Sequence, residues 1–268
     1  MANHHGDFIW YELITPDPDG AQAFYGPLLG WSFKAMDAPD MDYRLAGTVE
    51  ADVAGIMKMP ADNGEMPPCW LGYVGVDDVD AMAASIKGGG GAVHMEPWDI
   101  PGVGRMAFVS DAQGAMFYVM KGAVEGGESL SFSYDKPRVG HCAWNELATD
   151  DPAAALHFYG QRFGWVKDGG MDMGELGEYQ FLRHAGRAPD GSPPGSVMLG
   201  AVMPLMPGME HSVWTHYFRV PDIDVAVAHT TSNGGTITQP PTEIPGGDFS
   251  MNGIDPQGAH FALVGGRA

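Results

Sequence analysis

The sequence predicts an α+β protein built from two copies of one unit, and three observations support that prediction. A long stretch, WYELITPDPDGAQAFYGPLLGW at residues 10–31, returns as WNELATDDPAAALHFYGQRFGW at residues 144–165. A shorter one, DAQGAMF at residues 111–117, returns as DPQGAHF at residues 255–261. Strand-like and helix-like periodicities also alternate within each copy, which is typical of helices that cover one face of curved sheets.

Each copy begins with a strand and a helix whose ends are marked in the sequence. In the first copy a β-type run at residues 8–15 precedes Asp17, a residue type that caps helix N-termini, and Pro18 suits the first helical position. Apolar residues then recur at the spacing of one helix face until Gly30, which ends the helix. Further strands are expected at residues 43–47 and 53–59.

The pattern restarts in the second half of each copy. A strand is predicted at residues 70–76, a helix at 78–89, and further strands at 104–111 and 115–121. Because the second copy repeats this order, a strand, a helix and several strands occur four times in the chain.

The spacing between the copies locates one insertion. The offset is 134 residues at Trp10 and Trp144 but 144 residues at Val76 and Val220, so the second copy has gained ten residues. The segment 184–195, rich in Pro, Gly and Asp, is the expected place, as a hairpin tip. The predicted domains are residues 1–124 and 140–268, joined by a linker at residues 125–139.

The amino-acid composition disfavours two classes of binding partner. Lys and Arg number 14 against 34 Asp and Glu, which gives a net charge of -20 and disfavours nucleic acid and membrane surfaces as partners. No apolar run is long enough to span a bilayer, and the start MANHHGDFIW shows no secretory signal. Cys69 and Cys142 lack CxxC spacing, which favours a reduced, cytoplasmic setting.

The repeated motifs resemble those of the vicinal oxygen chelate superfamily, which includes glyoxalase I, extradiol dioxygenases and bleomycin-resistance proteins. The motifs are D-P…A-x-x-F-Y-G…G-W, V-x-D-[VI]-D and D-x-Q-G-A-x-F, and they cover residues 8–121 and 140–264. The chain looks like the two-copy glyoxalase-like proteins of that superfamily. The resemblance implies four βαβββ modules that form two tandem glyoxalase-like cups, each curled around a pocket.

Metal-dependent members of that superfamily hold a divalent metal with His, Gln or Glu side chains that project into the cup. Carried over onto this sequence, those positions fall on Trp10, Leu71 and Tyr118 in the first copy and on Trp144, Thr215 and Ala262 in the second. These side chains bind a hard cation poorly. We therefore expect no cofactor at the usual positions, while a divalent metal at a shifted site stays open.

Two glutamates occupy equivalent positions in the two copies. Strand alternation places Glu12 on the face of Trp10 and Glu146 on the face of Trp144. A carboxylate beside an apolar wall suits a general base or an acceptor for a ligand, and it equally suits a structural acid that binds backbone N–H groups or an arginine. His260 is a further candidate for catalysis or partial metal ligation, against the alternative of a packed strand histidine.

The other candidate ligand-binding residues follow from the same parity. They are Trp10, Trp144, Tyr73, Tyr118, Thr215 and Tyr217. The candidate site residues of the second copy are more polar than those of the first. If only one copy is active, we therefore expect it to be the second. His216 has the opposite parity and is expected to face a helix or solvent.

We interpret the chain as a glyoxalase/bleomycin-resistance-like protein that binds a small, partly aromatic organic molecule in a cup pocket, without the usual metal site. The alternative is a lyase, isomerase or dioxygenase that uses acid/base chemistry or a metal at a shifted site. A third possibility is that one copy is a structural partner for the other. The expected partner is a small molecule, and the chain is expected to be a monomer or a homodimer.

Overall fold

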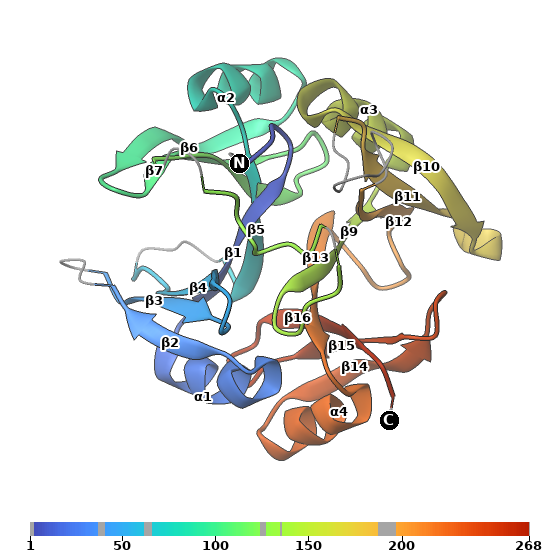
Figure 1. Ribbon diagram of the computed structural model, residues 1–268. Helices are drawn as coiled ribbons and strands as arrows, with labels where there is room; N and C mark the ends of the chain where they lie inside the picture. The colour runs from blue at the N-terminus through green and yellow to red at the C-terminus, as the bar shows by residue number, and fades with distance from the viewer. Residues whose placement is uncertain are drawn as a thin grey trace. The chain divides into compact units, whose positions relative to one another are not determined.

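The computed structural model describes residues 3–36, 41–61, 66–123, 127–134, 136–186 and 197–267. Over these residues strands and helices alternate in the predicted order (Figure 1). Of the segment expected to carry the insertion, residues 187–195 lie outside the described residues.

The first copy contains two βαβββ modules. The first is β1 (Phe8–Thr15), α1 (Pro18–Leu29), β2 (Ser32–Ala35), β3 (Tyr43–Gly47) and β4 (Asp52–Lys58). The second is β5 (Cys69–Gly75), α2 (Val79–Gly88), β6 (Ala92–Ile100), β7 (Gly104–Ser110) and β8 (Met116–Gly122).

The second copy repeats both modules. The third is β9 (Cys142–Thr149), α3 (Pro152–Phe163), β10 (Trp165–Asp172), the 3-10 turn η1 (Gly174–Leu176), β11 (Glu178–His184) and β12 (Met198–Pro204). The fourth is β13 (Val213–Val220), α4 (Ile223–Ser232), β14 (Thr236–Glu243), β15 (Phe249–Ile254) and β16 (His260–Gly265).

The strands of each copy belong to one eight-stranded sheet. The orders are β2-β3-β4-β1-β5-β8-β7-β6 and β10-β11-β12-β9-β13-β16-β15-β14. In every module the first strand pairs in parallel with the last, and the other neighbours within the module are antiparallel. The predicted α+β class and the four βαβββ modules in two tandem halves are therefore confirmed.

The helix ends follow from the residues that marked them in the sequence. Asp17 and Asp151 accept hydrogen bonds from backbone N–H groups at the starts of α1 and α3, where proline is the first helical residue. Gly30 and Gly164 end these helices with φ of 68° and 69°, a left-handed conformation that glycine adopts without steric cost. The local signals therefore specified both helices correctly.

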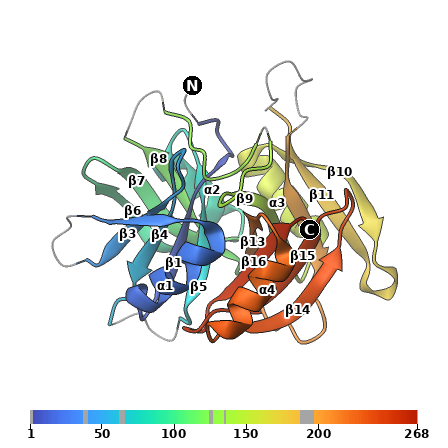
Figure 2. The same ribbon diagram turned by 60° about the horizontal axis from the view of Figure 1, so that its bottom comes forward.

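The contacts between residues group the chain into two compact units that differ from the two copies. Unit 1 contains Met1–Ile9, Gly72–Ser129 and Trp144–Trp214, and unit 2 contains Trp10–Leu71, Leu130–Ala143 and Thr215–Ala268. Within unit 1, α2 packs against α3 (Figure 1), and within unit 2, α1 packs against α4 (Figures 1 and 2). Each unit thus combines one module from each copy. The predicted domain boundaries stay a prediction.

The core of unit 1 is an aromatic cluster around one buried tyrosine. The Tyr159 hydroxyl donates to a carboxylate oxygen of Asp111 at 2.9 Å and accepts from the indole N–H of Trp214 at 2.9 Å. The Trp165 ring stacks on Tyr159 with centroids 5.2 Å apart. Burial raises the pKa of the Tyr159 hydroxyl well above its usual value and raises that of Asp111.

Unit 2 has the same core built from the equivalent residues. Tyr25 donates to Asp255 at 2.9 Å and accepts from Trp70 at 3.1 Å. Trp31 donates its indole N–H to the backbone oxygen of Gly140 at 2.7 Å. Buried polar groups are costly unless they are paired, and these bonds pair them. The bonds of Tyr25 to Asp255, Tyr159 to Asp111 and Trp31 to Gly140 join residues from opposite copies within each unit.

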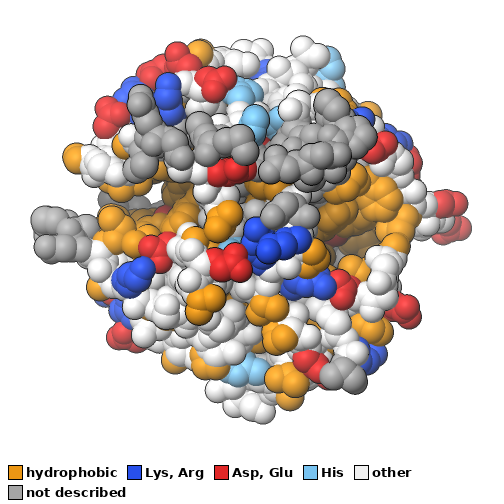
Figure 3. Space-filling model, in the orientation of Figure 1, with side chains coloured by type: hydrophobic (Ala, Val, Ile, Leu, Met, Phe, Trp, Pro, Cys, Tyr) orange, Lys and Arg blue, Asp and Glu red, His pale blue; other side chains and the backbone are white. Residues whose placement is uncertain are grey.

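The surface reflects the acidic composition. Figure 3 shows Asp and Glu side chains at several separate places on the face in view, with Lys, Arg and hydrophobic side chains between them. Among the described residues, no helix combines the length and apolar character that crossing a membrane requires.

Candidate functional site

Two of the predicted site residues of unit 1 belong to a hydrogen-bonded chain of three side chains. The indole N–H of Trp144 donates to the Tyr179 hydroxyl at 2.7 Å, and that hydroxyl donates to Glu146 Oε2 at 2.6 Å. The three side chains are all half-buried. Because a hydrogen bond to a carboxylate is stronger than one between neutral groups, the chain fixes the orientation of all three side chains.

Strand geometry explains how these residues meet. Trp144 and Glu146 are two residues apart on β9, so they project from the same face of the sheet. Tyr179 and Phe181 alternate in the same way on β11, and Phe181 lies edge-on to Trp144 with centroids 6.1 Å apart. Aromatic side chains therefore lie beside Glu146 on this face of the sheet.

Unit 2 holds an equivalent arrangement from the first copy. The indole N–H of Trp10 donates to the Tyr43 hydroxyl at 2.9 Å. Glu12, 3% exposed, lies beside Gly55 in the parallel pairing of β1 with β4. A Cβ atom built on Gly55 would fall on the Tyr43 hydroxyl, so this hydroxyl lies on the face of the sheet from which Glu12 projects.

Cys69, the first residue of β5, adds a thiol near Glu12. Burial, together with the negative charge of Glu12, raises the pKa of the Cys69 thiol to about 12. The thiol is therefore neutral at ordinary pH, and it is a poor nucleophile because thiolates are the reactive form. Nothing in the sequence had indicated this neighbour of Glu12.

The remaining predicted ligand-binding residues differ between the copies. In unit 1, Tyr73 stacks on Tyr118 with centroids 4.3 Å apart and ring planes at 15°, and both rings are buried. In unit 2, Tyr217 lies beside Ala262 in the equivalent strand pairing, so a methyl group takes the place of the second ring. Thr215, two residues before Tyr217, is half-buried.

The two histidines of interest have opposite environments. His260 is exposed at the start of β16, and Ala262, expected on the same face, is fully buried. His216 is 3% exposed, and its ring centroid lies 4.9 Å from that of Tyr11, so it faces the core of unit 2 rather than solvent. Burial lowers the pKa of His216 to about 3.

The residues at the superfamily's ligand positions do not fit a divalent metal. At two of these positions the available nitrogen is an indole N–H, which can only donate, and each donates to a tyrosine. Within the part of the chain that the structure describes, no three His, Cys, Asp or Glu side chains gather as a metal site would need. The expectation that no metal occupies these positions stays a prediction.

Sequence reasoning missed Tyr43 and Tyr179, the two hydroxyl groups that join the tryptophans to the rest of each arrangement. Both lie on strands for which the sequence suggested no candidate site residue. Each follows an acidic residue and comes two residues before an apolar one, in DYRLAG and in EYQFLR. Aligning these two short runs would have shown a tyrosine repeated in both copies.

Comparison with known proteins identifies relatives over both copies. The sequence model of the Glyoxalase/Bleomycin resistance protein/Dioxygenase superfamily matches residues 7–119 and 138–263. A Mycobacterium bovis protein named "Putative glyoxylase CFP32" is 35% identical over 259 residues, which are 95% of this chain and 93% of that protein. The Streptomyces peucetius "Anthracycline biosynthesis protein DnrV" is 31% identical over 269 residues, covering 95% of this chain and 91% of that protein.

A solved structure shows the same likeness of fold. The Mn(II)-bound glyoxalase from Novosphingobium aromaticivorans has a TM-score of 0.64 at 17% sequence identity, covering 99% of this chain and 83% of that one. The matches confirm the resemblance seen in the repeated motifs and the architecture of two tandem halves.

Proposed function

The chain belongs to the Glyoxalase/Bleomycin resistance protein/Dioxygenase superfamily, and on that premise we propose that it binds a small, partly aromatic organic molecule against Trp144. The single observation that carries this proposal is the hydrogen-bonded chain from Trp144 through Tyr179 to Glu146. It holds an aromatic surface and a carboxylate side by side before any ligand arrives. Such preorganisation reduces the entropy that binding costs.

The chemistry of the site favours an aromatic ligand that carries a hydrogen-bond donor. The Trp144 and Phe181 rings offer faces and edges for stacking, and Glu146 accepts hydrogen bonds. A relative named for anthracycline biosynthesis supports the same class of molecule, because anthracyclines are fused aromatic compounds with hydroxyl groups. We propose that binding does not use the superfamily's usual metal, since the residues at those positions do not fit one.

A titration with an anthracycline tests binding directly. Quenching of protein or ligand fluorescence should saturate, and Trp144→Ala should weaken the affinity by on the order of a hundredfold, because stacking area and the anchor of Tyr179 are both lost. Trp10→Ala is the matched control, and it should leave most of the affinity. Equal losses in the two variants, or no saturable binding by this compound or by a panel of hydroxylated aromatics, would contradict the proposal.

A second candidate function is acid/base catalysis as a lyase, isomerase or dioxygenase. The observation that favours it is the 2.6 Å bond from Tyr179 to Glu146, which places a phenol proton next to a carboxylate. A general base must lie within hydrogen-bond reach of the proton that it removes from the substrate. A relative named as a glyoxylase and the superfamily itself supply the reaction class. His260, exposed at the start of β16, stays a weaker candidate for this role.

Turnover separates the two functions. With 2-oxoaldehyde adducts as substrates, Glu146→Gln would abolish turnover but preserve binding if Glu146 is the base. Metal analysis of chelator-free protein tests the metal-dependent form, which requires stoichiometric metal that a Glu146→Ala, His260→Ala variant loses. Saturable binding without turnover or metal supports the binding function.

A further inference from the structure

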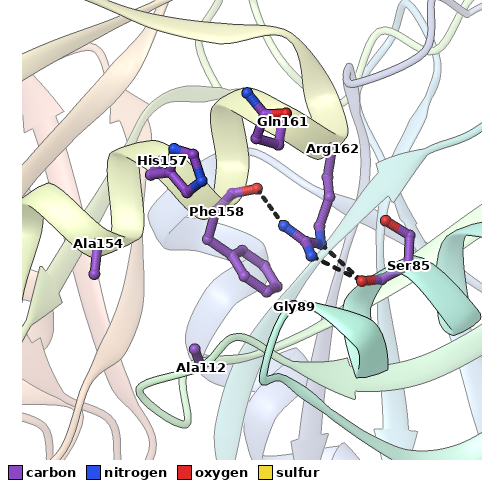
Figure 4. A pocket seen from close by; sticks show the side chains of 8 residues that line it. All are labelled: Ser85, Gly89, Ala112, Ala154, His157, Phe158, Gln161 and Arg162. Carbon is purple, nitrogen blue, oxygen red and sulfur yellow. Dashed lines mark hydrogen bonds between the residues drawn. The ribbon is translucent and has the colours of Figure 1, made fainter.

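A groove in unit 1 lies between α2 and α3, and it shares no lining residue with the Trp144 arrangement. It has a volume of about 450 Å³ (Figure 4). The lining residues are Ser85, Gly89, Ala112, Ala154, His157, Phe158, Gln161 and Arg162. None of them is acidic, although acidic residues outnumber basic ones by 34 to 14 in the whole chain.

The side-chain hydrogen bonds of Arg162 in this groove all go to backbone oxygens. Its Nε and Nη2 donate to the backbone oxygen of Ser85 at 3.2 and 2.8 Å, and Nη1 donates to that of Phe158 at 3.0 Å, as the dashed lines in Figure 4 show. The guanidinium carbon lies 4.0 Å from the centre of the Phe158 ring. The absence of a side chain at Gly89 makes room for it, because a Cβ there would overlap the guanidinium.

The bonds of Arg162 leave it with capacity for an anion. A guanidinium carries five N–H donors, and three serve the backbone oxygens. Among the described residues it forms no ion pair with a carboxylate, and burial lowers its pKa. By contrast, six other arginines form described ion pairs with acidic side chains, namely Arg44, Arg105, Arg138, Arg183, Arg219 and Arg267. Arg162 is therefore a fixed positive charge without a negative partner in the described part of the chain.

The equivalent helix pair of unit 2 lacks this chemistry. There the positions of Arg162 and His157 are Leu28 and Ala23 of α1. The α1–α4 contact is instead made by His229, whose Nε2 lies 2.9 Å from the backbone oxygen of Phe24. Packing two helices in this fold therefore does not require an arginine, and the polar groove belongs to unit 1.

We propose that the α2–α3 groove binds a small anionic group, a carboxylate or a phosphate, between Arg162 and His157. Arg162 supplies the two remaining N–H donors in the planar fork that suits both anions. His157 is exposed on the same helix, five residues before Arg162, lines the same groove and adds a second donor. This site shares no residue with the proposed aromatic site, so either proposal can fail alone.

Titration with inorganic phosphate tests the site on the full chain. With ionic strength held constant by sodium chloride, the NMR signals of the His157 ring should shift saturably, and its pKa should rise because a bound anion favours imidazolium. Parallel titrations with acetate identify which anion is preferred. Shifts that grow without saturation, or that sodium chloride reproduces, would overturn the proposal.

Three variants locate the effect. Arg162→Gln should weaken phosphate binding by about tenfold or more, since a charge-assisted pair is lost. Because that change also removes a contact between α2 and α3, His157→Gln keeps the helix contact intact and should weaken binding by about threefold. Arg183→Gln, at a half-buried arginine of the same unit that is paired with Asp168, should change nothing. Equal affinity in all three variants would exclude this groove.

Discussion

The Trp144 arrangement of the second copy and the Trp10 arrangement of the first copy are built alike and diverge at two neighbouring positions. In each, a tryptophan indole N–H donates to a tyrosine hydroxyl. Each also has a glutamate two residues after the tryptophan on the same strand. Beside the glutamate, however, the first copy has Gly55 and the second has Ala201. Facing that residue across the next strand, the first copy has Leu45 and the second has Phe181.

These differences show how the same Trp–Tyr hydrogen bond can be surrounded by different side chains in the two copies. In the first copy the Tyr43 hydroxyl lies directly on Gly55, where no side chain separates it from the strand. In the second copy the methyl group of Ala201 occupies that place, and Tyr179 reaches Glu146. Leucine offers no stacking surface, whereas Phe181 adds an aromatic edge to Trp144. The second copy thus has an aromatic ring where the first has an aliphatic side chain.

The largest effect is expected from exchanging the residue beside the glutamate. Gly55→Ala places a methyl group on the Tyr43 hydroxyl, so the tyrosine or the strand must move, and we expect a loss of about 1–3 kcal/mol in the free energy of unfolding. The matched Ala201→Gly removes a buried methyl group and should cost about 1 kcal/mol. Urea unfolding measures both, and a neutral Gly55→Ala would show that Tyr43 is free to leave its place.

The parts of this comparison that sequence reasoning reached are those set by local pattern. Asp17, Gly30 and their counterparts cap helices through contacts within a few residues, and period-2 alternation places Trp144 with Glu146. The roles of Tyr43 and Tyr179 could not be predicted, because each bonds to a tryptophan 33 or 35 residues away on another strand. No local sequence pattern fixes the register between those strands.

Longer-range partners were further out of reach. Tyr25 and Asp255 are 230 residues apart in the chain, and their bond depends on one module packing with a module of the other copy. The repeat itself says only that Tyr25 and Tyr159 have equivalent surroundings. It does not say which copy supplies them, since the same motif occurs in both.

A second effect is expected from removing the phenol hydroxyl of each copy. Tyr179→Phe deprives Glu146 of its donor and Trp144 of its acceptor, so we expect a loss of about 1–2 kcal/mol in stability. If the second copy binds the aromatic ligand, affinity should also fall by about tenfold. Tyr43→Phe is the matched control and should leave the affinity nearly unchanged. Equal losses of affinity would place the ligand at both copies or elsewhere.

A smaller effect is expected from exchanging the aromatic edge. Phe181→Leu gives the second copy the side chain of the first and removes an edge-to-face contact with Trp144, which should weaken binding of an aromatic ligand by roughly 0.5–1.5 kcal/mol. Leu45→Phe makes the reverse change in the first copy. Calorimetric titration of both variants against the unmodified chain measures the difference. Improved binding by Phe181→Leu would mean that the ring obstructs the ligand.

The smallest effect concerns the thiol that only the first copy has, since Val213 stands at the position equivalent to Cys69. The pKa of Cys69 is raised to about 12 by burial and by Glu12, so its thiol stays protonated as pH rises from 7 to 10. Because the thiolate is the reactive form, alkylation by iodoacetamide should be slow at pH 8 and should accelerate with pH.

Glu12→Gln removes the charge but not the burial, so the pKa of Cys69 should fall only partly and the alkylation rate at pH 9 should rise severalfold. Glu146→Gln, in the second copy, is the control and should leave the rate unchanged. The alkylation rate at Cys69, followed by mass spectrometry, decides the matter: an unchanged rate in Glu12→Gln would mean that burial alone protects the thiol and that the carboxylate is directed away from it.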